Sequence, residues 1–158
     1  MSSLRLPLGV VAMLLWFVGT ALAMVWFVFR DAHFPFGWVA LGAVLPDVIG
    51  LIPGAVAPTH SVVMVVGYLA LAMILTIGRR ASRKKALALA FGLFMHLVAD
   101  FVFADTKLFW WPLGGTNVDA TRIPTLDRSV VANLALEALG AVLLLWFLRR
   151  LAVARQVR

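Results

Sequence analysis

Two pairs of polar residues interrupt long apolar stretches of the sequence, and each pair has helical spacing. His96 and Asp100 lie in FGLFMHLVADFVFAD (residues 91–105), and Asn133 and Glu137 lie in SVVANLALEALGAVLLLWFL (residues 129–148). Residues four apart share one face of a helix, so each pair projects in one direction. Imidazole and carboxylate groups in this pattern can bind a metal ion or transfer protons, and polar groups inside a membrane segment are usually functional.

A divalent cation would explain the acidic residues of the apolar segments. Asp47, Asp100 and Glu137 lie in segments that contain no Lys or Arg, and an ionised carboxylate at membrane depth costs about 2.5–3.5 kcal/mol. A cation neutralises such carboxylates and also accepts imidazole nitrogens, for which His60 and His96 are available. The chain has no cysteine, and His and carboxylate ligands suit zinc, with manganese and iron as alternatives.

Simpler explanations exist for each residue taken alone. His96 and Asp100 can form a hydrogen-bonded pair without a metal, and Asp47 can cap a short helix. Glu137 can accept a hydrogen bond from a neighbouring helix. The common depth of the residues favours a shared site. Counted from the expected outer end of each segment, both helical pairs lie at depths of roughly 6 and 12 Å, at 1.5 Å per residue.

Composition places the chain among integral membrane proteins. It has 158 residues, of which 63% are hydrophobic and 13% charged, and a soluble domain of this size needs more polar surface. We expect residues 1–158 to form a single transmembrane helical domain. Its apolar segments are 6–29, 36–56, 61–78, 86–104 and 129–148.

The expected fold is all-α, a polytopic membrane bundle of four spanning helices plus a broken or re-entrant segment. The irregular segment is 36–56, which contains Pro46, Gly50, Pro53 and Gly54, and proline and glycine interrupt helices. The alternative is five full spans. Thr59 or Ser61 is expected to cap the helix that follows.

The net charge of +7 comes mainly from RRASRKK (79–85) and RRLAVARQVR (149–158), beside apolar segments. Positive charge in this position indicates cytoplasmic loops and attraction to anionic headgroups. We therefore expect no nucleic-acid partner, the lipid bilayer as the main partner, and loop 79–85 and the C-terminus in the cytoplasm. Loop 105–128 and His60 are then on the outer side.

The order of four short motifs resembles the bacterial membrane-bound metal-dependent hydrolase family, which includes an SOS-regulated inner-membrane member. The motifs are LPD (45–47), THS (59–61), HLVAD (96–100) and LFWWPLGG (108–115). The resemblance covers roughly residues 38–115 and implies a location in the bacterial plasma (inner) membrane. It also implies distant kinship with zinc-dependent hydrolases of phosphodiesters.

The resemblance implies that Asp47, His60, His96 and Asp100 are metal ligands. The second acid of the family's Pro-Asp-x-Asp stretch is absent, because Val48 and Ile49 follow Asp47. The smaller ligand set indicates one metal ion or a member without activity.

We therefore predict a membrane-embedded metal-dependent hydrolase of a phosphoester bond in a lipid or lipid-linked substrate. Glu137 is the predicted general base or additional ligand, and Asn133 is predicted to orient it. The alternative is a non-catalytic membrane protein that binds an ion or small ligand for transport or as a subunit of a complex. A purely structural bundle is a third possibility.

Overall fold

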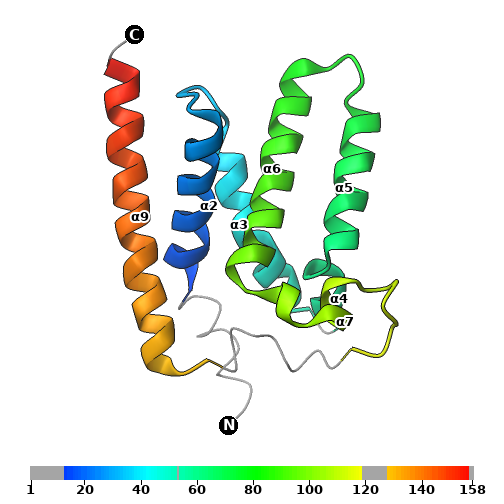
Figure 1. Ribbon diagram of the computed structural model, residues 1–158. Coiled ribbons are helices and arrows are strands. Elements are labelled where there is room, and N and C mark those ends of the chain that lie inside the picture. Colours follow the sequence, from blue (N-terminus) through cyan, green and yellow to red (C-terminus); the bar gives the residue numbers. More distant parts are fainter. Residues whose placement is uncertain (1–12, 53, 119–127, 157–158) are drawn as a thin grey trace.

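The computed structural model describes residues 13–52, 54–118 and 128–156, and these residues form helices and loops without a strand. The all-α expectation is therefore confirmed for the described part of the chain. The helices, labelled in Figure 1, are α2 (Leu14–Phe29), α3 (Phe36–Gly50), α4 (Val56–Thr59), α5 (Val62–Leu75), α6 (Arg80–Ala99), the 3-10 helix η1 (Val102–Ala104), α7 (Thr106–Phe109) and α9 (Val130–Gln156).

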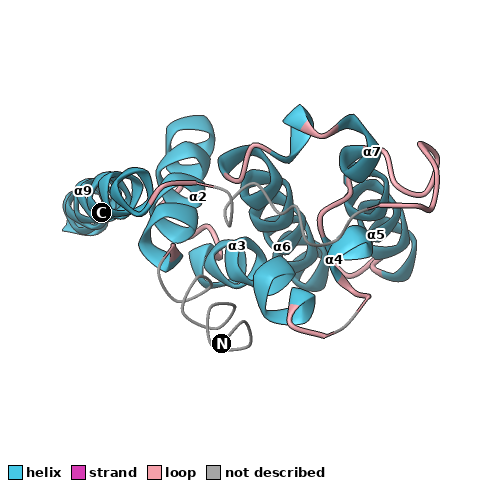
Figure 2. Ribbon diagram, turned by 90° about the horizontal axis from the view of Figure 1, so that it is seen from below, coloured by secondary structure: helices cyan, strands magenta, loops and turns pink. Residues whose placement is uncertain are grey.

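The five longer helices run alternately up and down, in the order α2, α3, α5, α6 and α9 (Figure 1). α9 packs on α2, α2 packs on α3 and α6, and α6 packs on α3 and α5. Figure 2 shows the resulting row of helices from its lower end, with α9 and α5 at opposite sides. The α5–α6 loop and the C-terminal end of α9 lie at the upper end in Figure 1, whereas α4 and α7 lie at the lower end. The basic stretches of the sequence thus share one end of the molecule.

The irregular segment breaks after Gly50, within the set of residues expected to interrupt it, but not at Pro46. α3 continues through Pro46 to Gly50, so the expectation of a break at Pro46 is wrong. Pro46 lies four residues before the last residue of α3, and its missing N–H removes one hydrogen bond from the helix. The break follows Gly50, and Gly54 has a φ of 82° in the turn before α4, a conformation that glycine adopts without strain.

Ser61 begins α5, as expected for one of the two predicted caps. Ser61 has an extended backbone just before the first residue of the helix, and its side chain accepts a hydrogen bond from the N–H of Val63 at 3.1 Å. The Ser61 hydroxyl also donates to the carbonyl oxygen of Trp111. One buried side chain therefore caps α5 and holds the loop after α7 against it.

Two glycine pairs allow helices to cross with their backbones in contact. Gly42 of α3 faces Gly92 of α6, and Gly19 of α2 faces Gly140 of α9; a Cβ at any of these four positions would collide with the opposite backbone. Small residues permit such close approach between helices in membrane proteins. The Gly42–Gly92 crossing sets the spacing between the helices that carry Asp47 and His96.

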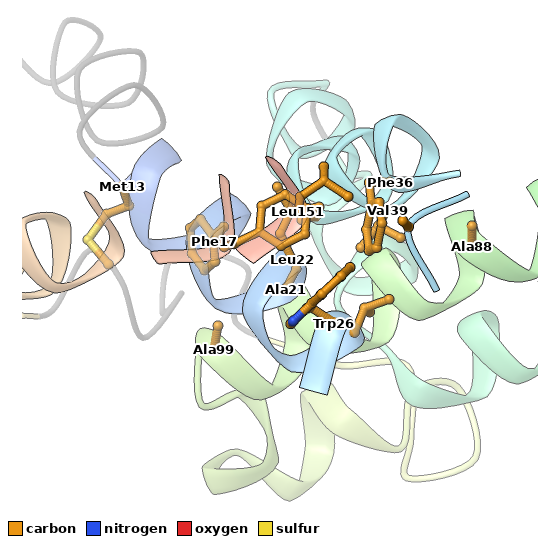
Figure 3. Packing of buried hydrophobic residues seen from close by; sticks show 14 residues of the cluster. Met13, Phe17, Ala21, Leu22, Trp26, Phe36, Val39, Ala88, Ala99 and Leu151 are labelled. Carbon is orange, nitrogen blue, oxygen red and sulfur yellow. The ribbon is translucent and has the colours of Figure 1, made fainter. Parts of the chain in front are cut away.

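A buried apolar cluster fills the space between α2, α3, α6 and α9 (Figure 3). Phe36 and Phe147 pack edge to face with ring centroids 4.8 Å apart, and Trp26 lies 6.0 Å from Phe36. Aromatic pairs at these separations add to the stabilisation from burial. Phe17, at the lower end of this cluster, extends it to His96.

Among the described residues, α9 is the one helix that is long and apolar enough to cross a membrane. It has 27 residues, and only 11% of its most apolar window is buried within the protein. α2, α3 and α5 are apolar but shorter. Residues 6–12 of the first expected span lie outside the described residues. The number of spans, four or five, thus stays a prediction.

Candidate metal centre

His96 is held from both sides near the C-terminal end of α6. Its side chain is fully buried, and its Nδ1 lies 2.8 Å from the carbonyl oxygen of Ala43 on α3. A carbonyl oxygen only accepts hydrogen bonds, so Nδ1 carries the proton and Nε2 carries the lone pair. The ring of Phe17 packs on the other side, with centroids 4.3 Å apart. The imidazole is therefore fixed in both orientation and tautomer.

His60 has the same arrangement in the junction between α4 and α5. Its Nδ1 lies 3.1 Å from the carbonyl oxygen of Val56 and 3.0 Å from the hydroxyl oxygen of Thr59. The Thr59 hydroxyl directs its own proton to the carbonyl oxygen of Ala55 at 2.8 Å. Nδ1 of His60 is thus the donor, and its Nε2 also presents a lone pair. His60, like His96, is fully buried.

Asp47 completes a triangle of three donor atoms. The two Nε2 atoms of His60 and His96 lie 3.3 Å apart, and the Oδ1 of Asp47 lies 3.5 Å from each of them. The Asp47 side chain is 12% exposed, so the group lies just beneath the surface. His60 directly follows α4, which lies at the lower end of the bundle (Figure 1). Three electron-pair donors face one another, which is the arrangement that a cation stabilises.

The size of this triangle fits a small divalent cation. In a tetrahedral site with bonds of about 2.0–2.1 Å, neighbouring ligand atoms lie about 3.3–3.4 Å apart. The observed separations of 3.3 and 3.5 Å match this spacing. The backbone carbonyls behind both imidazoles are the partners that metal-bound histidines usually have. Asp47, His60 and His96 therefore form a group that can hold a metal ion.

Asp100 does not belong to this group of three. Its buried carboxylate lies near Arg128, with Oδ1 3.6 Å from Nη2, and the same Nη2 donates to the Asp100 carbonyl oxygen at 2.8 Å. The Arg128 guanidinium also lies over the ring of Phe101 at 5.2 Å. Three of the four predicted ligands thus converge, and the fourth has a cation from the polar loop beside it.

Glu137 lies at the beginning of α2. Its Oε1 accepts from the N–H of Leu15 at 3.1 Å and its Oε2 from the same N–H at 3.2 Å, and the N–H of Trp16 lies 3.5 Å from Oε1. These are N–H groups of a first helical turn, where a negative group is favourable. Glu137 therefore caps a neighbouring helix, the simpler of its two explanations. Asn133 lies one turn earlier on α9, and neither residue joins the metal group.

The sequence motifs gave no sign of several residues that shape the centre. The carbonyl of Ala43 orients His96, and Phe17 covers its ring. The glycine pair that allows this contact has one weak signal, because Gly92 precedes His96 by four residues and thus lies on the same face of α6. The pairing of Arg128 with Asp100 had none.

No family model matches this chain, and neither do the curated proteins or the solved structures with which it was compared. The family resemblance therefore depends on the four short motifs of the sequence. The function has to be inferred from the geometry of the centre and from the character of the surface around it.

Proposed function

We propose that this protein is a membrane-embedded metal-dependent hydrolase of the bacterial plasma membrane, related to the family that its motifs resemble. The observation that supports a metal is the triangle of Asp47, His60 and His96. Backbone carbonyls hold both Nδ1 atoms, so both Nε2 lone pairs point into the same space as a carboxylate oxygen. Without a cation, the lone pairs of two nitrogen atoms and one carboxylate oxygen would face one another at 3.3–3.5 Å and repel one another.

The membrane placement rests on the surface of the bundle. α9 exposes large apolar side chains along most of its length, as does α5, in which Val65 is the buried residue. We propose that α2, α3, α5, α6 and α9 cross the bilayer together, with loop 79–85 and the C-terminal end of α9 in the cytoplasm. The metal centre then lies at the outer end, opposite the basic stretches.

The ligands suit zinc, and manganese and iron are alternatives. Two neutral imidazoles and one carboxylate leave a positive charge on a divalent ion and a fourth position open, as in catalytic zinc sites. A cation held there supplies a Lewis acid that lowers the pKa of water and polarises the ester bond to be cleaved. The protein orients the ligands and buries two of them.

We propose a phosphoester in a lipid or lipid-linked molecule as the substrate. The Asp47 edge of the centre lies near the surface, at the end where the bundle meets the outer headgroups. Arg128 lies against Asp100, one helical turn beyond His96, and its guanidinium suits phosphate oxygens. The Asp100 carboxylate holds that guanidinium in place. The guanidinium favours an anionic headgroup over a neutral one.

The second candidate is a membrane protein that binds the ion without catalysis. The observation that favours it is the position of Glu137, whose two oxygens accept hydrogen bonds from α2. The predicted general base is thus engaged elsewhere. Under this reading the three-ligand centre serves ion binding or stabilises the outer end of the bundle.

Metal analysis of the purified protein tests the proposal. We expect about one equivalent of zinc, manganese or iron, lost in His60→Ala and His96→Ala. His33→Ala is the matched control, because His33 lies in the loop between α2 and α3, at the other end, with its side chain 70% exposed. Equal metal content in His96→Ala and His33→Ala would exclude this metal centre.

Hydrolysis assays then separate the two candidates. We expect the purified protein in mixed micelles to release phosphate or a phosphorylated headgroup from lipid phosphoesters. Hydrolysis should stop when the metal is chelated and should recover when zinc is added. Metal binding that depends on His96 without hydrolysis of phospholipids or lipid pyrophosphates would favour the ion-binding protein.

A further inference from the structure

A recess lies at the end of the bundle opposite the metal centre. It has a volume of about 460 Å³ and is formed by the C-terminal parts of α2 and α9. Two arginines and three aromatic residues line it, namely Arg30, Arg150, Trp26, Phe27 and Trp146. The recess is thus large enough for a small molecule and combines positive charge with apolar walls.

Local structure directs both arginines to the recess. Arg30 ends α2 in a left-handed conformation with a φ of 48°, and its N–H bonds to the carbonyl oxygen of Trp26 at 2.9 Å. Its guanidinium lies 5.8 Å from the centre of the Phe27 ring. Arg150 follows Trp146 by one turn of α9, and its guanidinium carbon lies 5.8 Å from the centre of the Trp146 ring. Each cation is therefore placed over an aromatic wall.

The acidic side chains of the described residues do not balance the charge of the recess. Within the described residues, no acidic side chain forms an ion pair with Arg30 or Arg150. Asp31, the acid next in sequence to Arg30, accepts a hydrogen bond from Lys84 at 3.0 Å. Two positive groups thus border one recess whose remaining walls are apolar, and a ligand that complements them has an anionic head and an apolar body.

Basic residues at this end of the bundle would by themselves orient the chain in a membrane. Orientation does not require that arginines and aromatic side chains line a common recess. Arg79 and Arg80, at the α5–α6 loop, also lie at the upper end (Figure 1), and neither lines this recess. The recess, by contrast, has a packed wall, because Trp26, which lines it, is only 9% exposed. Basic recesses between membrane helices on the cytoplasmic side bind anionic lipid headgroups.

We infer that this recess binds an anionic phospholipid of the cytoplasmic leaflet, with its phosphate between Arg30 and Arg150 and its acyl chain along Trp146. The inference depends on the membrane placement in the proposed function, but not on the metal or on hydrolysis. Bound lipid would bridge the ends of α2 and α9, which otherwise meet mainly through apolar side chains and the Gly19–Gly140 crossing.

Native mass spectrometry of the detergent-purified protein with added phosphatidylglycerol tests this site. The double variant Arg30→Gln/Arg150→Gln is compared with Arg79→Gln/Arg80→Gln, which removes the same charge from the same end. We expect about thirtyfold weaker binding in the first variant and little change in the second, since each basic residue near an anionic headgroup contributes roughly fivefold. Phosphatidylcholine should bind weakly to all forms.

Three results would overturn the inference. These are equal losses in both double variants, equal binding of phosphatidylcholine and phosphatidylglycerol, and displacement of the lipid by excess inorganic phosphate, which would indicate a site for free anions. Metal content is measured on the same samples. It should be unchanged in the Arg30→Gln/Arg150→Gln variant, so failure of the lipid site and failure of the metal centre are distinguishable.

Discussion

Gly92→Ala tests whether the close crossing of α3 and α6 builds the metal centre. A Cβ at Gly92 would lie 2.8 Å from the Cα of Gly42, 2.9 Å from the backbone nitrogen of Ala43, and against the carbonyl oxygen of Val39. Ordinary contacts of a Cβ begin at 3.4 Å. The two helices therefore have to separate by about 1 Å at this point, because the obstacles are backbone atoms.

The same separation moves the ligands. The bond from His96 Nδ1 to the Ala43 carbonyl oxygen, now 2.8 Å long, would stretch to about 3.8 Å, beyond hydrogen-bond length. Asp47 lies one turn after Ala43 on α3, so its distance to His96 grows as well, while metal sites tolerate about 0.2 Å. We expect a loss of metal affinity of about 10–100-fold, as for removal of other hydrogen-bond partners of metal ligands.

The free energy of unfolding of Gly92→Ala should fall only modestly, although its metal affinity falls strongly. Overpacking costs about 1–3 kcal/mol, and replacing a helical glycine by alanine returns up to about 1 kcal/mol. Zinc affinity is measured by competition with a chromophoric chelator, and unfolding is followed by intrinsic fluorescence in detergent. Gly67→Ala is the control, because a Cβ at Gly67 on α5 meets no atom within 4 Å.

A second control separates overpacking from damage to the centre. Gly19→Ala forces a Cβ against the backbone of Gly140, at a crossing that carries none of the three ligands. It should reduce stability but leave zinc affinity nearly unchanged. The reasoning fails if Gly92→Ala binds zinc as tightly as Gly67→Ala, or if Gly19→Ala loses zinc to the same extent as Gly92→Ala.

Two further predictions concern groups outside the centre. Glu137→Ala should lower the free energy of unfolding by about 1–2 kcal/mol through loss of the cap on α2, with metal content unchanged; a catalytic role would instead abolish hydrolysis in Glu137→Gln without this loss. The backbone N–H of His33 and the ammonium of Lys84 hold the pKa of Asp31 below its ordinary 3.8, so its small stabilisation is complete above pH about 4 and is lost as the pH falls through the folded-state pKa. Asp31→Asn should therefore reduce stability near neutral pH and flatten the acid limb of its pH profile, and an unchanged acid limb would contradict this.

The sequence by itself indicated the helical class and the three polar residues of the centre, Asp47, His60 and His96. Long apolar segments with few charges indicated helices, because inside a bilayer such segments would have to satisfy their backbone polar groups internally. Local sequence also offered Thr59 and Ser61 as caps for α5, and Ser61 is the cap that the structure shows. These features depend on neighbouring residues in the chain, and a sequence displays them directly.

Tertiary structure decided which of the polar residues meet. Asp100 has the same helical spacing to His96 as a ligand pair, yet Arg128 contacts it from the end of the following loop, 28 residues later in the chain. Glu137 caps α2, which lies more than a hundred residues away in sequence. The centre of Asp47, His60 and His96 forms because Gly42 and Gly92 allow α3 and α6 to touch. The distance between two helix axes depends on side chains from both helices, so it cannot be predicted from the residues of one segment alone.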